Sequence, residues 1–181
     1  MEQVEKVPTL RLFFALWPSS AECAALSAWH SPLRKLCGGR VMRTDTLHST
    51  LVFLGEVEKA RLQALRQAAQ ETKAGRFELK LTSAHYWGHN HIVYAAPDAT
   101  PPQLAELVQG LESALRTYHF NFDKRPYKPH VTLLRNAHWN DVPLPPLPVV
   151  HWKFNDFVLV QSLRDEDGTP HYEVLARFPL K

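Results

Sequence analysis

Hydrophobic and polar positions at the start of the chain predict a strand followed by a helix. Residues 9–16 combine alternation with a fully apolar centre, which is typical of a strand buried on both faces. After it, Ser19 and Glu22 have the spacing of a helix capping box, and apolar residues recur at helical intervals as far as Gly38. Pro32 should kink this helix or end it early, because proline cannot donate the helical hydrogen bond.

The next segment repeats the order of strand and helix and then changes it. Residues 47–54 are rich in β-formers and predict a strand that stops at Gly55, and the following helical pattern ends at Gly75. Alternation over 77–82 and a β-rich run over 91–96 predict an antiparallel hairpin. We therefore expect a sheet that is antiparallel at least in part.

The C-terminal half predicts one long helix and several strands. An apolar stripe runs through 101–118, and Thr100 has capping-box spacing at its start. The predicted strands cover 130–134, the region near 152–163, and 171–178. Together the elements indicate the α+β class.

Length and composition favour one self-sufficient globular domain. The chain has 181 residues, of which 45% are hydrophobic and 22% charged, unlike the composition of disordered proteins. Its net charge of +3 is a mild positive bias, which permits a polyanionic substrate without requiring one.

The sequence shows no pattern typical of a targeting signal or of a cysteine metal site. It contains no apolar run of about 18 residues, and residues 1–7 lack the layout of a signal peptide. Cys23 and Cys37 do not have the spacing of a thiolate metal site. We expect a cytoplasmic protein that does not associate with membranes.

The strongest chemical signal is a tetrapeptide that occurs twice. The pattern His-x-Thr-Leu begins at His48 and again at His130, each time at the start of a predicted strand. Residues two apart on a strand share a face, so each copy presents an imidazole beside a hydroxyl, at Thr50 and at Thr132. One copy alone would more simply be a half-buried polar pair in a sheet, whereas two copies at this composition indicate a site.

Two such pairs suit the cleavage of a phosphodiester. A neutral imidazole can take a proton from the attacking oxygen while a protonated one gives a proton to the leaving oxygen. The threonine hydroxyls can donate hydrogen bonds to the phosphate oxygens where charge accumulates. Because the pKa of histidine lies at about 6.5, both protonation states coexist near neutrality and this chemistry needs no metal.

These motifs and their surroundings resemble the two-histidine (2H) phosphoesterase superfamily. Within it the chain most resembles the bacterial and archaeal RNA 2′,3′-cyclic phosphodiesterases, first named 2′-5′ RNA ligases. The resemblance rests on segments 11–15, 47–57, 128–135, 161–163 and 168–172, and so covers nearly the whole chain. It implies a single domain over 1–181 with a bilobal, internally duplicated α+β fold, antiparallel sheets lining a central cleft and helices outside.

The resemblance also implies an activity and the roles of four residues. The activity is the opening of a terminal 2′,3′-cyclic phosphate of RNA to a 2′-phosphomonoester, without metal or cofactor. Separately from the resemblance, we expect a monomer. His48 would be the proton donor and His130 the proton acceptor, with Thr50 and Thr132 holding the phosphate. These two labels come from the resemblance alone, because the motifs are chemically alike.

Arg135 matches the arginine that follows the family's second motif, where it could contact the phosphate or stack on the terminal base. Strict alternation places it on the face opposite His130 and Thr132, unless the strand bends or ends at Leu134. Ser49 stands where the family usually has an apolar residue, and alternation predicts that it points away from the cleft.

Aromatic and basic residues give further candidates for contacts with the substrate. Tyr127 lies in a basic loop before the second motif, which is either a solvated turn or a patch at the edge of the cleft that meets RNA. Phe13 and Tyr172, with Trp17 and Trp87, are candidate walls for a stacked base.

The sequence is also compatible with other functions. The same site could act in 2′-5′ ligation or on another small cyclic nucleotide, or the chain could be a non-catalytic module that binds nucleotides or RNA. His85, His89 and His91 could bind a metal, but no Cys, Asp or Glu lies between them, and we interpret them as surface or cleft histidines.

Overall fold

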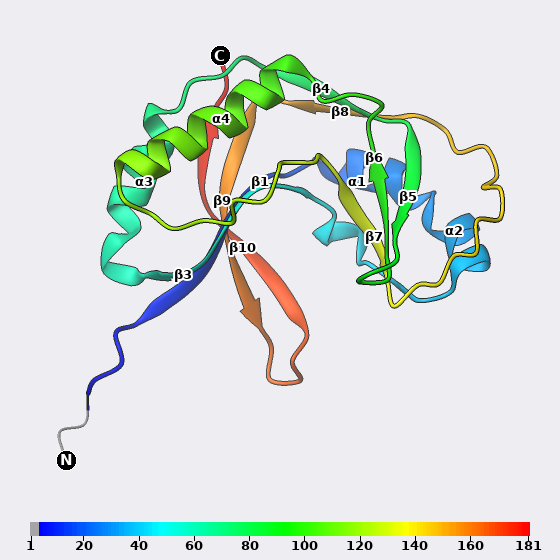
Figure 1. The fold of residues 1–181 in the computed structure, drawn as a ribbon, viewed down its shortest axis with the longest axis horizontal. Helices are drawn as coiled ribbons and strands as arrows, with labels where there is room; N and C mark the ends of the chain where they lie inside the picture. The colour runs from blue at the N-terminus through cyan, green and yellow to red at the C-terminus, as the bar shows by residue number, and fades with distance from the viewer. Residues whose placement is uncertain (1–3) are drawn as a thin grey trace.

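The computed structural model describes residues 4–181 and shows the expected mixture of helices and antiparallel sheets (Figure 1). The helices are α1 (Ser20–Ser27), α2 (His30–Cys37), α3 (Leu62–Glu71) and α4 (Pro102–Thr117). The strands are β1 (Thr9–Leu16), β2 (Arg40–Val41), β3 (Ser49–Glu58), β4 (Phe77–Leu81), β5 (Ser83–Trp87), β6 (Ile92–Ala96), β7 (Val131–Arg135), β8 (Val150–Phe154), β9 (Asp156–Arg164) and β10 (Pro170–Pro179).

Two four-stranded antiparallel sheets form the body of the molecule. The first sheet has the order β10-β9-β1-β3, the second has the order β2-β7-β6-β5, and β4 pairs separately with β8. Helices α3 and α4 pack together and contact the first sheet, whereas α2 contacts β2 and β7 of the second (Figure 1). Each sheet is therefore covered by its own helices on one face.

The other face of each sheet carries a small cluster of its own. The main core draws side chains from all four α-helices and from both sheets. Phe13 and Ala15 belong to a separate cluster on the first sheet, and Tyr94 belongs to another on the second. Two faces thus remain outside the main core, one on each sheet, and both carry a motif threonine.

The leucine of each His-x-Thr-Leu motif forms a β-bulge. Leu51 has no partner on β1, although the residues on either side of it do, and Leu133 likewise has none on β6. A bulge shifts the alternation of a strand by one position. Each bulge therefore brings the residue three places after the motif threonine, Phe53 or Arg135, onto the face of that threonine.

The first predicted helix is two helices. The capping box is present, since the Ser19 hydroxyl accepts from the backbone N–H of Glu22 and the Glu22 carboxylate accepts from that of Ser19. The chain breaks after Ser27 and a new helix begins at His30. Pro32 thus stands in the first turn of α2, where its missing N–H leaves no bond unmade.

Two predicted ends were wrong. β3 continues past Gly55 to Glu58, because Gly55 adopts a φ of +73° beside a further bulge and so bends the strand without ending it. Helix α3 ends at Glu71 and not at Gly75, since Thr72 is already extended.

The predicted hairpin has a different first strand. Residues 77–81 pair with β8, and the strand that pairs with β6 is Ser83–Trp87. Helix α4 begins at Pro102 without a side-chain cap, so the capping box expected at Thr100 does not form. The region near 152–163 is also two strands, β8 and β9, which belong to different sheets.

Gly39 provides a test of how tightly β2 is fixed against β7. A Cβ on Gly39 would lie 2.6 Å from the carbonyl oxygen of Arg135, and the φ of Gly39 is +83°. Gly168 has almost the same φ, +82°, but open space around it. We expect Gly168→Ala to lower the free energy of unfolding by about 1–2 kcal/mol through backbone strain. Gly39→Ala should cost clearly more in urea denaturation, and equal losses would show that the clash is relieved.

Candidate active site

Both motif histidines are held in the same way. Nδ1 of His48 lies 2.7 Å from the carbonyl oxygen of Thr46, and Nδ1 of His130 lies 2.8 Å from that of Lys128. A carbonyl oxygen only accepts hydrogen bonds, so Nδ1 of each ring carries the proton. Nε2 of the neutral ring is then left with its lone pair, which is the form of imidazole that can accept a proton.

His48 is surrounded by aromatic side chains of the first sheet. The ring of Trp17 stacks on it at 4.9 Å between centroids, and Phe13 and Tyr172 lie at 5.2 and 5.3 Å. Burial is the main reason why the pKa of His48 falls from 6.5 to about 4, and the positive charges of His130 and Arg135 lower it further. In the free protein this imidazole is neutral near pH 7.

His130 lies against aromatic side chains of the second sheet. Trp87 meets its ring edge-on at 4.7 Å between centroids, and Tyr94 does so at 5.8 Å. The pKa of His130 is lowered from 6.5, mainly by burial and also by the ammonium group of Lys128. The bond to the Lys128 carbonyl opposes this shift by favouring the charged ring.

The structure brings the two motifs together. Strands β3 and β7 are in contact, and His130 lies close enough to His48 for its charge to lower the pKa of His48. Thr50 pairs with Ala15 and Thr132 pairs with Tyr94, so each threonine lies on the sheet face that carries a small cluster. The structure therefore places the two motifs next to each other, with each threonine on a sheet face outside the main core.

Arg135 lies on the same face as the second motif. The bulge at Leu133 lets Leu134 pair with Val93 while Thr132 pairs with Tyr94, which places Leu134 and Thr132 on opposite faces. Arg135 then shares the face of Thr132, and its charge lowers the pKa of His48. Strict alternation does not hold here, because the strand bends at the motif leucine.

Tyr127 does not join this site. Its ring packs against the main core, and its hydroxyl is buried without a hydrogen-bond partner, close to the hydroxyl of Ser49. Burial raises the pKa of Tyr127. Ser49 is fully buried on the side of β3 away from Thr50, as alternation predicted. Tyr127 lies under the first motif, so stacking on a substrate is not a role that its position supports.

Only one cation of the basic loop reaches the motifs. Arg125 pairs with Asp123, and the ammonium of Lys124 lies over the ring of Phe122. The ammonium of Lys128 donates to the hydroxyl of Tyr94 at 3.0 Å, next to His130. The loop is thus mostly a surface turn with one residue directed into the site.

The other histidines of the hairpin make local contacts. Nε2 of His85 lies 2.8 Å from the hydroxyl of Ser83, and Nδ1 of His91 lies 2.8 Å from that of Tyr86. Within residues 4–181 no group of three or more His, Cys, Asp or Glu side chains is arranged to hold a metal ion. The same part of the chain contains no helix long and apolar enough to cross a membrane.

The sequence does not single out two residues that contact the motif histidines, Tyr94 and Thr46. In the sequence Tyr94 is only one residue of a predicted strand, and Thr46 belongs to no motif. Tyr94 pairs with the motif strand across the second sheet, and Thr46 contributes only its backbone carbonyl to His48. Such contacts depend on strand pairing and backbone geometry, which leave no signal in residue types.

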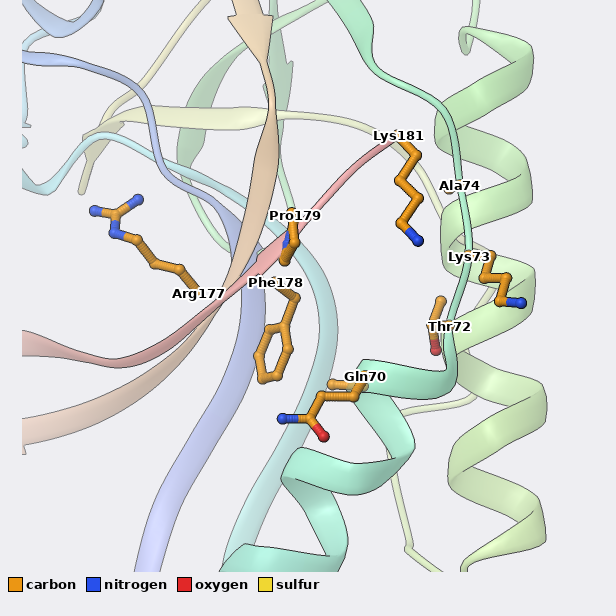
Figure 2. A pocket seen from close by; sticks show the side chains of 9 residues that line it. Gln70, Thr72, Lys73, Ala74, Arg177, Phe178, Pro179 and Lys181 are labelled. Atoms are coloured by element: carbon orange, nitrogen blue, oxygen red, sulfur yellow. The ribbon is translucent and has the colours of Figure 1, made fainter.

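A separate hollow lies away from the motifs. It has a volume of about 570 Å³ and is formed where the end of α3 meets the end of β10 (Figure 2). Figure 2 shows Phe178 and Gln70 along one side and Lys181 above them. Its lining includes no residue of either motif. We therefore do not assign the active site to this hollow, in spite of its volume.

The family of the chain follows from comparisons with known proteins. The sequence matches the family described as LigT like phosphoesterase over residues 16–94 and again over 95–169. Each matched segment contains one His-x-Thr-Leu motif. The chain belongs to this family.

Relatives and solved structures agree with that assignment. The chain is 33% identical over 173 residues to an RNA 2′,3′-cyclic phosphodiesterase of Escherichia coli, covering 94% of this chain and 96% of that protein. The apo crystal structure of E. coli LigT superposes with a TM-score of 0.85 at 30% identity, covering 95% of this chain and 98% of that one. A crystal structure of the same protein with 3′-AMP gives 0.84 at 30% identity, covering 96% and 99%.

The contribution of the aromatic rings to the low pKa of His48 can be tested by mutation. Replacing Trp17 by Ala removes the ring stacked on the imidazole and lets water reach it, so the pKa of His48 should rise from about 4 toward 6.5. A titration of the histidine resonances by NMR measures this shift. Trp139→Ala is the control, because Trp139 packs beside Tyr86 instead. An unchanged titration of His48 in Trp17→Ala would show that the ring does not keep water out.

Proposed function

We propose that the protein opens 2′,3′-cyclic phosphate ends of RNA to 2′-phosphomonoesters, with His48 as proton donor and His130 as proton acceptor and without a metal ion. The observation that carries the proposal is the pair of imidazoles, each fixed through Nδ1 with Nε2 free and each beside a threonine. The name of the E. coli relative supports the choice of substrate.

The reaction is one displacement at phosphorus. Nε2 of His130 takes a proton from water, and the oxygen of that water forms a bond to phosphorus. The bond between phosphorus and the ribose O3′ breaks, and O3′ takes the proton from Nε2 of His48. The product keeps the phosphate on O2′, and the two imidazoles have exchanged their protonation states, which solvent then restores.

The threonines and the arginine stabilise the charge on the phosphate. The hydroxyls of Thr50 and Thr132 donate to its non-bridging oxygens, where negative charge grows in the transition state. Arg135, on the face of Thr132, supplies a positive charge to the same oxygens. This cation must sit near His48 to do so, which explains part of the low pKa of that ring.

The bound phosphate makes His48 an acid. In the free protein burial and nearby cations favour its neutral form. A cyclic phosphodiester carries one negative charge, which favours the charged imidazole next to it. His48 therefore becomes protonated, and able to donate a proton, when the cyclic phosphate binds.

The aromatic side chains place the ribose. Phe13, Trp17 and Tyr172 surround the proton donor, and the donor must lie beside the leaving O3′. The terminal nucleoside is uncharged apart from its cyclic phosphate, so an aromatic wall on this side suits it. A small cyclic nucleotide would meet the same contacts as an RNA end.

Both halves of the chain are needed for the site, because each provides one imidazole and one hydroxyl. We propose that 1–181 acts as a single domain of two lobes, as a monomer in the cytoplasm. A module that only binds RNA would not need two imidazoles whose Nε2 atoms are both left free, which favours an enzyme.

The test is hydrolysis of a short oligoribonucleotide that ends in a 2′,3′-cyclic phosphate. His48→Ala and His130→Ala should each lower kcat by at least about 10²-fold, the usual loss of a general acid or base. His151→Ala is the matched control, because His151 pairs with Glu78 on another sheet. Activity should survive treatment with EDTA.

Either of two results would reject this proposal. Full activity in His130→Ala would remove the proton acceptor from the mechanism. Loss of activity in EDTA that returns with a divalent metal would show that the chemistry is not carried by the imidazoles alone.

The pH dependence has a definite sign. The pKa values of His48 and His130 both lie below 6.5 in the free protein, and kcat/KM reports the free enzyme. The kcat/KM profile should therefore be a bell with its optimum below pH 6.5. The bound anion raises both values, so the optimum of kcat should lie at higher pH. Measuring both profiles on one substrate checks this, and coincident optima would contradict it.

A further inference from the structure

The residue two places before each motif histidine differs between the two halves of the site. Thr46 provides the carbonyl for His48, and its hydroxyl donates to the carbonyl oxygen of Arg43 at 2.8 Å. Lys128 provides the carbonyl for His130 and also carries an ammonium group. The same backbone contact is thus combined with a cation in the second half only.

The ammonium of Lys128 is held by the two aromatic side chains that contact His130. It donates to the hydroxyl of Tyr94 at 3.0 Å and lies 5.3 Å and 5.5 Å from the ring centroids of Tyr94 and Trp87. These are the same two rings that meet the imidazole of His130 edge-on. The backbone of Lys128 thus contacts the imidazole directly, and its side chain contacts the two rings beside that imidazole.

We propose that Lys128 is a positioning residue for His130: its carbonyl oxygen holds Nδ1, and its ammonium, fixed on Tyr94 and Trp87, adds to burial in favouring the uncharged ring that accepts a proton. This inference rests on the proposed function, because it assigns a task within that reaction.

Several charged or titratable groups surround the two imidazoles. Lys128 comes from the loop before β7, Tyr94 from β6, His85 from β5, Arg135 from the end of β7, and His48 from the segment before β3. The ammonium of Lys128 lowers the pKa of His130 and of His85, whereas Arg135 acts on His48. Removing the charge at Lys128 leaves Arg135 in place, so the effect on His130 can be measured separately.

The experiment uses three variants of the whole protein. Lys128→Met removes the charge and keeps most of the volume, and Lys128→Arg restores the charge. Lys124→Met removes the same charge from the same loop, four residues earlier, where the ammonium lies over Phe122. Each is measured by NMR titration of His130, with its resonance identified by its absence in His130→Gln, and by the pH profile of kcat/KM on the cyclic-phosphate oligonucleotide.

We expect Lys128→Met to raise the pKa of His130 and to move the optimum of kcat/KM to higher pH. Lys128→Arg should return both toward the wild-type values, and Lys124→Met should change neither. A purely structural role would lower activity without moving the optimum.

Two outcomes would overturn the inference. In the first, His130 titrates in Lys128→Met as it does in the wild type. In the second, Lys128→Met raises KM and leaves the pH profile unchanged, which would make Lys128 a contact of the substrate. An inactive wild type would instead reject the proposed function, and the NMR titration would still report whether Lys128 acts on His130.

Discussion

Each motif imidazole depends on a hydrogen bond from its Nδ1 to a carbonyl oxygen two residues earlier in the chain. This bond fixes the ring orientation and the tautomer, and so it decides that Nε2 is the atom left for chemistry. The acceptor is part of the backbone, so it stays in place when the side chain of that residue changes. The two halves of the chain can therefore differ at this residue, Thr46 in one and Lys128 in the other, and still present the same imidazole.

A second constraint determines what stands beside the imidazoles. A bulge at the leucine of each motif shifts the alternation of the strand by one position. The residue three places after the motif threonine therefore lies on the same face as that threonine. In the first half the third position is Phe53, and in the second it is Arg135. The two halves thus share a backbone plan but differ in the side chain at this position, which is an aromatic ring in the first half and a guanidinium group in the second.

The sequence predicted the chemistry better than it predicted the pairing of strands. The repeated motif could be found because imidazole and hydroxyl have to stand two apart on a strand, and this spacing is visible in residue order. The position of Arg135 could not be predicted, because a bulge at Leu133 is a property of the backbone in the sheet. The strand over 77–81 was assigned the wrong partner, since its alternation fits β8 as well as β6 and only the whole fold decides between them. Tyr127 stands next to basic residues in sequence, but its ring is drawn into the main core under Ser49.

In the proposed reaction one imidazole activates water and the other protonates one particular ribose oxygen. This choice of oxygen can be read by ³¹P NMR of the product that EDTA-treated protein forms from an oligonucleotide with a 2′,3′-cyclic phosphate end. We expect a single phosphomonoester signal at the 2′ position, because His48 gives its proton to O3′ only. A 3′-phosphomonoester, or a mixture of both isomers, would contradict it.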